Sequence, residues 1–259
     1  MITSSANAKV KNVMNLVKKA KARKLSSLFV AEGLRIFREI PRDMIDSLFV
    51  SESFLKEESR KKLVEGLPFE VVSDDVFVAM SDTQTPQGIL ALVRQFSYKM
   101  EDLQTKDSPA FLMILEGIQD PGNLGTIIRA GEGAGITGVI MDDATADIYN
   151  PKVIRSTMGS VCRVPFVYTN DLKGTLKNLK AQGVRLYAAH LEGRNNYEKE
   201  DYTVDTGFLI GNEGNGLTEE TSALADALVK IPMMGKVESL NAAVAASILM
   251  FEAARQRRQ

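Results

Sequence analysis

The chain has 259 residues, of which 44% are hydrophobic and 25% charged, and its net charge at pH 7 is −1. This is the composition of a globular protein with one large domain or two ordinary ones. It has no apolar run of the ~20 residues that span a bilayer, and one cysteine and one histidine exclude an intrachain disulfide and make a zinc site improbable. We therefore expect neither a membrane nor a metal partner. Because the first residues lack the pattern of a signal peptide, we also expect a cytoplasmic location.

The first 25 residues form a basic arm without a single acid. Its cationic residues are Lys9, Lys11, Lys18, Lys19, Lys21, Arg23 and Lys24. The remaining 25 basic and 33 acidic residues leave the rest of the chain at −8. The arm also has hydrophobic residues at helical spacing, namely Val10, Val13, Met14 and Val17. A basic arm on an acidic protein indicates attraction to a polyanion such as nucleic acid, although a solvated helix face accounts for it equally well.

Residues 1–97 are predicted to form a small α/β domain. Apolar runs predict strands over 27–31, 47–50, 69–72 and 89–93, and helical patterns fall over 34–40, 54–65 and 75–80. Strands that alternate with helices indicate a layered α/β fold. The polar stretch that follows has neither hydrophobic period and contains Ser-Pro, so residues 98–109 are predicted to be a linker.

Residues 110–259 are predicted to form a second α/β domain around a parallel sheet. Strands are expected at 111–115, 139–141, 184–189, 208–210 and 228–231, and a long helix over 240–257. Phe111 to Leu115 is continuously apolar, as is typical of a strand that is buried on both faces.

Three junctions that follow predicted strands contain the candidate functional residues, because parallel α/β sheets bind ligands at the carboxyl ends of their strands. The first is 120–125 (DPGNLG), followed by a helix with Arg129, whose N-terminus offers N–H groups to an anion. The second is 211–217 (GNEGNGL), in which three glycines allow a flat ligand to approach the backbone. The third is 231–241 (IPMMGKVESLN), where Ser239 suits the N-cap of the last helix.

Each junction also has an ordinary structural explanation. The first is a common turn sequence, glycine-rich loops are frequent, and a serine before a helix is usually a cap. Gly131, Gly133 and Gly135 imitate a dinucleotide fingerprint but do not lie at a strand-to-helix turn. His190, at the end of a predicted strand, is interpreted as a structural residue.

Taken together, the three junctions resemble a known family. The segments Asp120-Pro-x-Asn-x-Gly…Arg129, Ile210-Gly-Asn-Glu-Gly-x-Gly and Ile231-Pro-Met…Glu238-Ser-Leu-Asn241 are similar, in order and spacing, to the three motifs of the SpoU (TrmH-type) RNA 2′-O-methyltransferases of the SPOUT superfamily. The resemblance covers 111–257. The N-terminal half resembles the substrate-binding domain of the ribosomal-RNA branch, at 29–33 (FVAEG) and 87–89 (QGI).

The resemblance implies an N-terminal RNA-binding domain over 1–97 and a methyltransferase domain over 110–259 with a deep trefoil knot, assembled as a homodimer. It also implies S-adenosylmethionine as cofactor, with the adenine held largely by backbone. On this chain the cofactor-binding positions are Leu209, Ile210, Gly211, Ile231, Met233 and Leu240. The positions that match the family's catalytic set are Asn123, Arg129, Glu213, Ser239 and Asn241.

The reaction so implied needs an aligned ribose oxygen and a route for its proton. The family mechanism makes Arg129 the base, which is awkward because a guanidinium normally stays protonated. The alternative is that Arg129 clamps a phosphate and stabilises the developing alkoxide. In either case we expect Asn123 to fix Arg129 or the ribose, Glu213 to orient the arginine or a partner motif, and Ser239 with Asn241 to organise the last loop.

Large-subunit ribosomal RNA is the expected substrate, because the tRNA-specific members have mainly helical extensions in place of a globular N-terminal domain. A tRNA 2′-O-methyltransferase and a non-catalytic RNA-binding assembly factor remain alternatives. A nicotinamide-dependent enzyme is disfavoured, because its glycine-rich turn follows the first strand of the fold, whereas here that sequence lies near the end of the chain.

Overall fold

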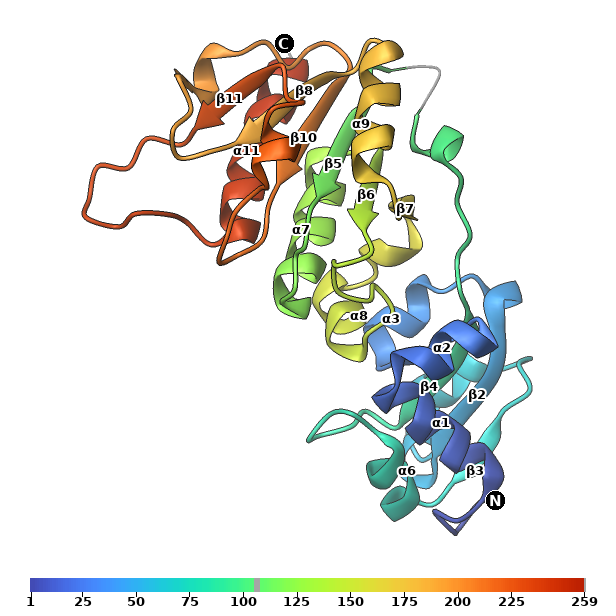
Figure 1. Cartoon of the computed structure of the whole chain (residues 1–259). Helices are drawn as coiled ribbons and strands as arrows, with labels where there is room; N and C mark the ends of the chain where they lie inside the picture. The colour runs from blue at the N-terminus through green and yellow to red at the C-terminus, as the bar shows by residue number, and fades with distance from the viewer. Residues whose placement is uncertain (105–107, 259) are drawn as a thin grey trace. The chain divides into compact units, whose positions relative to one another are not determined.

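The chain folds into two compact units, each built around its own sheet (Figure 1). The computed structural model describes residues 1–104 and 108–258; residues 105–107 of the predicted linker lie outside the described residues. The first unit comprises residues 1–96 together with 147–162, and the second comprises 97–146 and the residues from 163 onward. Within the described residues, no helix has both the length and the apolar character that a membrane span requires.

The first unit has a mixed four-stranded sheet in the order β1-β4-β2-β3, in which only the β2–β3 pair is parallel. Its strands are β1 (Leu28–Glu32), β2 (Ile45–Ser51), β3 (Glu70–Val72) and β4 (Ile89–Arg94). Its helices are α1 (Ala8–Lys18), α2 (Ala20–Ser26), α3 (Leu34–Glu39), η1 (Arg42–Met44), α4 (Glu52–Leu55), α5 (Glu58–Lys61), η2 (Lys62–Val64), α6 (Asp74–Met80), α8 (Pro151–Thr157) and η4 (Ser160–Cys162).

The basic arm is the helical cover of this sheet. Its buried face consists of Val10, Val13 and Leu16, which pack with α6 and the strands, whereas Met14 and Val17 are only half-buried. The predicted apolar face of the arm is therefore rotated by about one position, because Leu16 contacts the core more closely than Val17 does.

Residues 147–162 cover part of the other face of the same sheet. The ring of Tyr149 stacks on that of Phe29 in β1 at 4.8 Å between centroids, and its hydroxyl donates to the carbonyl of Phe96 at 3.0 Å. Helix α8 buries Val153 and Ile154 and contacts β1. A segment that follows the first two strands of the second sheet thus completes the core of the first unit.

Arg23 binds this segment to the arm. Its side chain is 4% exposed and pairs with the carboxylate of Asp147 at 2.7 Å. Its Nη1 also donates to the carbonyl oxygens of Leu16 and Val17, at 2.6 and 3.1 Å. Arg23 is therefore part of the protein interior, unlike the exposed lysines of the arm.

The helix predicted over 54–65 is broken in the structure. Ser51 caps α4 by accepting from the N–H of Phe54, whose buried ring anchors that turn. The backbone then becomes extended at Glu57, and the chain resumes as α5 and η2 before Val64 reaches the core. Phe54 and Val64 are the fully buried side chains at the two ends of this segment. The residues between them form no continuous apolar face that could stabilise a single helix by packing.

The second unit has a fully parallel seven-stranded sheet in the order β7-β6-β5-β10-β8-β11-β9. Its strands are β5 (Phe111–Leu115), β6 (Gly138–Asp142), β7 (Phe166–Thr169), β8 (Arg185–Ala189), β9 (Asn195–Asn196), β10 (Thr206–Ile210) and β11 (Ala227–Lys230). Its helices are η3 (Met100–Leu103), α7 (Pro121–Ala134), α9 (Leu172–Ala181), η5 (Tyr197–Lys199), α10 (Glu219–Ser222) and α11 (Ala242–Arg257). The predicted parallel α/β fold is confirmed; the two edge strands β7 and β9 were not predicted.

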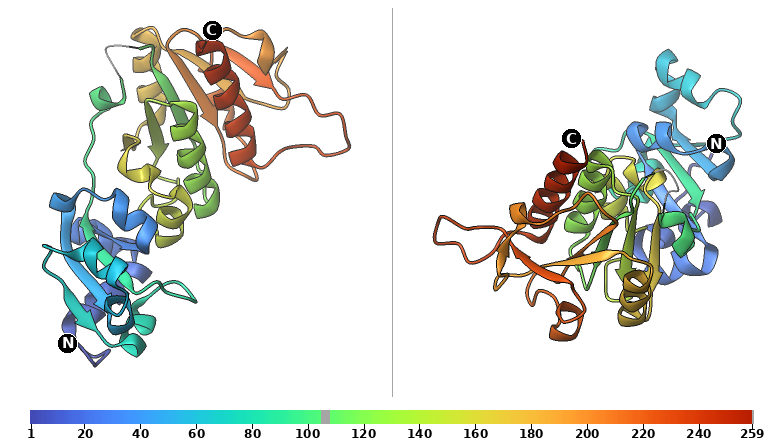
Figure 2. Two further views of the ribbon diagram at one scale, coloured as in Figure 1. Left: turned by 180° about the vertical axis from the view of Figure 1, so that it is seen from behind. Right: turned by 90° about the horizontal axis from the view of Figure 1, so that it is seen from above.

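Helices cover this sheet on both faces. Figure 2 shows α7 and α11 side by side on one face, and α9 lies on the other, where its Leu172, Leu176 and Leu179 pack with β-strand residues. A strand between two helical layers is apolar on both sides, which is why all five residues of β5 and of β10 are buried.

Replacing Arg23 with alanine is expected to lower the free energy of unfolding of the first unit by about 2–3 kcal/mol. The change removes the donors from Asp147 Oδ2, on a carboxylate that is 30% exposed, and from two carbonyls beside a guanidinium that is 4% exposed. Denaturant unfolding followed by circular dichroism measures the loss. The matched control Lys24→Ala, on the exposed face of α2, should stay within about 0.5 kcal/mol of the parent. Equal stability of the two variants would contradict a structural role for Arg23.

Candidate functional site

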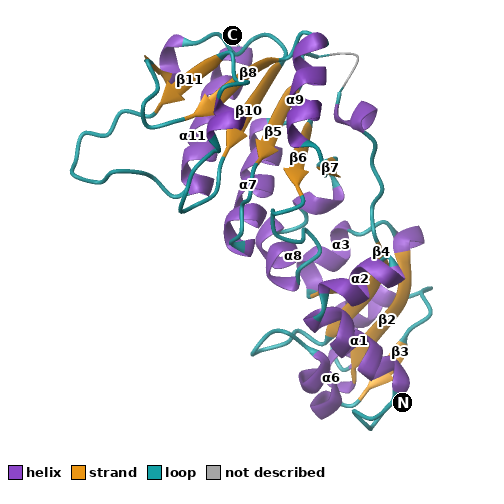
Figure 3. Cartoon of the chain, viewed as in Figure 1, coloured by secondary structure: helices purple, strands orange, loops and turns teal. Residues whose placement is uncertain are grey.

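The three predicted loops lie together at the carboxyl ends of the strands of the parallel sheet. They follow β5, β10 and β11, and the carboxyl ends of parallel strands face the same way. β10 pairs directly with β5, although 95 residues separate Phe111 from Thr206. Figure 3 shows the long connection between β11 and α11 as a loop without regular structure.

The first loop leads into α7 through a capped start. The side chain of Asp120 accepts from the N–H of Asn123 at 2.9 Å, and Pro121 occupies the first helical position. The backbone N–H groups of Gln119 and Asp120 donate to the carboxylate of Glu213, each at 3.1 Å. The carboxylate of Glu213 therefore binds two N–H groups that directly precede α7, at the junction whose helix N-terminus was expected to offer N–H groups to an anion.

The second loop folds back on itself immediately after β10. Backbone hydrogen bonds join Asn212 and Gly216 in both directions, at 3.0 and 2.9 Å. A side chain at Gly211 would overlap the backbone of Gly216 and Leu217, and Gly216 has a φ of +69°. These two glycines are thus required by the fold of the loop itself, a role that the sequence analysis did not assign to them.

Asn123 joins the three loops. Its Nδ2 donates to Glu213 Oε1 at 2.9 Å, and its Oδ1 accepts from Asn241 Nδ2 at 2.9 Å. Asn212 adds a bond from its Nδ2 to the carbonyl of Gly117 at 2.7 Å. One residue from each predicted motif is therefore held in a single hydrogen-bonded chain.

Asn241, and not Ser239, is the N-cap of the last helix. Its Oδ1 accepts from the N–H groups of Ala243 and Val244 at 2.9 and 3.3 Å, and α11 begins at Ala242. The N-cap position suggested for Ser239 is therefore wrong, because the helix begins two residues later than predicted. Ser239 is exposed and makes no hydrogen bond within the described part of the chain.

Arg129 lies on the exposed side of α7, about two turns after Asn123. Among the described residues it has no hydrogen bond or ion pair, so neither Asn123 nor Glu213 contacts it. Its planar guanidinium is available to a ligand from outside the chain.

The expected cofactor-binding positions divide into two groups. Leu209 and Ile210 are buried in β10, whereas Ile231, Met233 and Leu240 are half-buried, as is Gly211. Within the described residues, the backbone N–H groups of 233–240 donate no hydrogen bond. An adenine held by backbone groups needs such unpaired donors beside apolar side chains, and the residues present fit this requirement.

Two further residues lie at the carboxyl ends of these strands: Glu116, which was not singled out from the sequence, and His190, which was interpreted as a structural residue. Glu116, directly after β5, accepts from the hydroxyls of Thr218 and Thr221 at 2.9 and 2.6 Å and from the N–H of Thr218 at 2.8 Å, which fixes the end of the second loop. His190 follows β8, the strand between β10 and β11. An acid directly after an apolar strand was the available signal for Glu116.

Glu213 has a pKa below its usual value of 4.5. Burial raises the pKa of this carboxyl, but the hydrogen bonds from Asn123 and from the backbone N–H groups of Asp120 and Gln119 together outweigh that effect. The network is therefore built on an ionised carboxylate.

Comparison with protein-family models finds two similarities along the chain. Residues 110–251 match the SpoU rRNA Methylase family, and residues 7–91 match the MRM3-like substrate binding domain. Among curated proteins, the chain is 34% identical over 252 residues to the 23S rRNA (guanosine(2553)-2'-O)-methyltransferase RlmP of Bacillus subtilis (strain 168). The alignment covers 96% of this chain and 97% of that protein.

Solved structures give the same picture. The SpoU methyltransferase AviRb from Streptomyces viridochromogenes, in complex with AdoMet, is similar with a TM-score of 0.87 and 26% identity over 98% of this chain and 99% of that one. The AdoMet-bound rRNA methyltransferase from Sinorhizobium meliloti is similar with a TM-score of 0.84 and 30% identity over 98% and 97% of the two chains.

Glu213→Gln is expected to destabilise the second unit at neutral pH and to matter progressively less in acid. A depressed pKa contributes stability that is complete above the unfolded value, near 4.5, and is lost as the pH falls through the lower folded value. Denaturant unfolding of both proteins from neutral pH into acid measures the difference. Glu238→Gln, an exposed acid in the third loop, is the control and should show no such convergence. A difference that is independent of pH would contradict the ionised network.

Proposed function

The chain belongs to the SpoU rRNA Methylase family, and we propose that it transfers a methyl group from S-adenosylmethionine to a ribose 2′-hydroxyl of 23S ribosomal RNA. It is an RNA 2′-O-methyltransferase, as is RlmP of Bacillus subtilis, which it matches over 96% of its length. The assignment rests on the extent of that match. It is supported by the hydrogen-bonded network of Asn123, Glu213 and Asn241, which lies at the carboxyl ends of the strands, where the three motifs meet.

Ribosomal RNA is favoured over tRNA as the substrate by how far each match extends. The similarity to the 23S rRNA enzyme includes both units, and the N-terminal unit matches a substrate-binding domain model. The tRNA-modifying structures from the same comparison, at TM-scores of 0.51 and 0.53, cover only 61% and 57% of this chain. An inert assembly factor is disfavoured, because the motif positions are intact.

When bound, S-adenosylmethionine supplies a methyl group on a sulfonium, which the ribose oxygen displaces. In our proposal the backbone of Gly211, Ile231, Met233 and Leu240 holds the adenine, with Leu209 and Ile210 as the apolar support beneath it. The unpaired N–H groups of 233–240 support this arrangement. Relatives crystallised with AdoMet have the same overall fold.

Arg129 is the proposed catalytic residue that contacts RNA. Its guanidinium is exposed and has no partner among the described side chains, so it can bind a phosphate through its planar fork. A cation at this position stabilises charge that develops on the 2′-oxygen, while the proton leaves to phosphate or water. Arg129 then acts as a clamp, and the reaction does not require it to lose its own proton.

Asn123, Glu213 and Asn241 are proposed as positioning residues, because their polar groups already bind one another. Ser239, exposed between the cofactor-binding positions and the helix cap, is proposed to contact RNA or the methyl donor. We also propose that residues 110–259 form the deep trefoil knot that the resemblance to the family implies. The position of α11 beside α7, after the long third loop, supports it.

A homodimer is proposed through the outer face of α11. Val244, Ile248 and Phe251 recur at i, i+4 and i+7, and Val244 and Phe251 are 47% and 46% exposed although the helix is also apolar on its buried side. Large exposed apolar groups on one helix face are characteristic of an interface. The face belongs to the same helix that Asn241 caps, so the dimer would support the third loop.

The basic arm is proposed to bind RNA through Lys18, Lys19 and Lys21, which are exposed, and without Arg23, which is buried. Because ribosomal RNA is the proposed substrate, we propose the cytoplasm as the location.

The function is tested by mapping 2′-O-methyl groups in ribosomal RNA and tRNA from cells with and without the gene. One 23S site is expected to lose its methyl group and to regain it with the wild-type gene. Loss at a tRNA position would replace the proposed substrate, and no loss at all would contradict the activity.

Arg129→Ala is expected to reduce methyl transfer at least about 100-fold, as the loss of one charge-stabilising donor does, with no change in cofactor binding by calorimetry. Arg129→Lys keeps the charge but loses the fork, so it should be similarly inactive at every pH. Arg258→Ala, an exposed arginine at the end of α11, is the control. A lysine variant that stays active with its pH profile shifted to lower pH would identify residue 129 as the base.

Phe251→Asp is expected to weaken self-association by about 30-fold or more, about 2 kcal/mol, because it places a charge where an aromatic anchor would be desolvated. Sedimentation velocity over a concentration series measures this effect. Lys177→Asp, exposed on α9 across the sheet, introduces the same residue and should leave association unchanged. A monomeric parent protein would contradict the dimer.

A further inference from the structure

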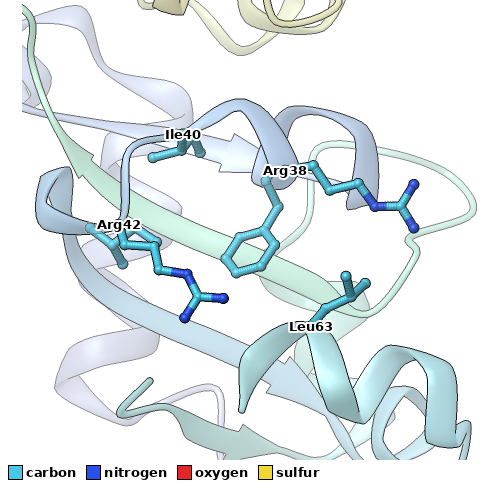
Figure 4. A pocket seen from close by; sticks show the side chains of 6 residues that line it. Arg38, Ile40, Arg42 and Leu63 are labelled. Carbon is cyan, nitrogen blue, oxygen red and sulfur yellow. The ribbon is translucent and has the colours of Figure 1, made fainter. Parts of the chain in front are cut away.

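A small pocket opens in the first unit at the end of α3 (Figure 4). It has a volume of about 200 Å³ and is lined by Phe37, Arg38, Ile40, Arg42, Ile45 and Leu63. These residues come from the last turn of α3, from η1, from the start of β2 and from η2. The pocket lies outside the basic arm and outside the loops of the second unit.

The pocket combines an apolar floor with a cationic rim. Phe37 and Ile40 are 7% and 5% exposed, so they present only part of their surface, whereas Arg38 and Arg42 are exposed. Figure 4 shows the two guanidinium groups apart, on either side of the pocket. Neither arginine has a hydrogen bond or an ion pair from its side chain within the described residues.

The charge around the pocket is mixed. Residues 35–46 contain three arginines and three acids, Glu39, Asp43 and Asp46, and the side chain of Glu39 packs against Gly159. Two unpaired arginines beside an aromatic wall are the groups that single-stranded nucleic acid needs: guanidinium groups for phosphates and an apolar surface for a base. The volume is below the ~300 Å³ at which pockets for drug-sized ligands begin, which suits one base.

We propose that this pocket takes one unpaired nucleotide of the RNA substrate, with its base against Phe37 and Ile40 and its flanking phosphates on Arg38 and Arg42. The proposal rests on the proposed function only in taking RNA as the substrate. A second nucleotide site away from the reacting ribose would determine which RNA is held, because base contacts specify sequence and phosphate contacts position the chain.

The test uses the full-length protein and an oligouridylate of about six nucleotides that contains 4-thiouridine, with a duplex RNA of the same length for comparison. We expect the single strand to bind more tightly than the duplex and to crosslink, on irradiation, to peptides that contain residues 37–45 or 63. Crosslinks confined to other peptides would overturn the proposal, as would equal binding of the duplex.

Substitutions distinguish the contribution of the base contacts to binding from that of the phosphate contacts. Arg38→Gln with Arg42→Gln should weaken oligonucleotide binding about tenfold at low salt and reduce the salt slope by about 0.7 per lost phosphate contact. Leu63→Trp fills the pocket without changing charge and should remove the crosslink. Controls are Arg35→Gln, exposed on the same helix but outside the pocket, and Val78→Trp, exposed on α6.

If Arg35→Gln lowers the affinity as much as Arg38→Gln with Arg42→Gln does, the effect is general charge attraction and the site is overturned. A Leu63→Trp protein with unchanged affinity and crosslinks would do the same. Thermal unfolding and S-adenosylmethionine binding should match the parent in every variant. The oligonucleotide assay needs no methyl transfer, so the two proposals can fail separately. Binding in the pocket without methylation would refute the activity alone. Methylation together with pocket variants whose oligonucleotide binding is unchanged would refute the pocket alone.

Discussion

The amide of Asn123 is the interaction on which the candidate site depends. It uses both of its ends: the nitrogen donates to Glu213 and the oxygen accepts from Asn241, residues that lie 90 and 118 positions away in the chain. The donor end requires an acceptor-only partner, which the ionised carboxylate of Glu213 provides. An aspartate at 123 would face that carboxylate, and an alanine would remove one donor from Glu213 and leave the side-chain nitrogen of Asn241 without its acceptor. The residue type is therefore set by the geometry of three loops together.

This arrangement is possible because β5 and β10 are neighbours in a parallel sheet. Their adjacent carboxyl ends bring Glu116 to Thr218, Gly117 to Asn212 and Glu213 to the start of α7. The glycines of the second loop allow its two ends to approach closely, since Gly211 has no room for a side chain beside the backbone of Gly216 and Leu217. What remains open toward a ligand is the third loop, where the N–H groups of 233–240 donate no hydrogen bond within the described residues, and the exposed side of α7 with Arg129.

Four arginines of this chain occupy three physically different environments. Arg23 is buried, paired with Asp147 and bonded to two carbonyls, so it stabilises the first unit. Arg38 and Arg42 lie at a pocket, and their guanidinium groups have no partner in the part of the chain that the structure describes; Arg129 is exposed on a helix. A count of basic residues cannot separate these environments. The division between the structural cation and the cations proposed to bind RNA follows from burial and from the presence or absence of an acceptor among the described residues.

Hydrophobic period and motif order in the sequence determined the α/β class, most strands and the three loops, because apolar runs of strand length can be buried in few ways. The sequence could not place β7 and β9, which are short edge strands, or the break in the helix at 54–65. It also could not show that residues 147–162 complete the first unit or that Arg23 is interior, since both depend on contacts more than 100 residues apart. The cap at Asn241 and the role of Asn123 as a bridge were decided only when strand order in the sheet brought distant polar groups within 3 Å of one another.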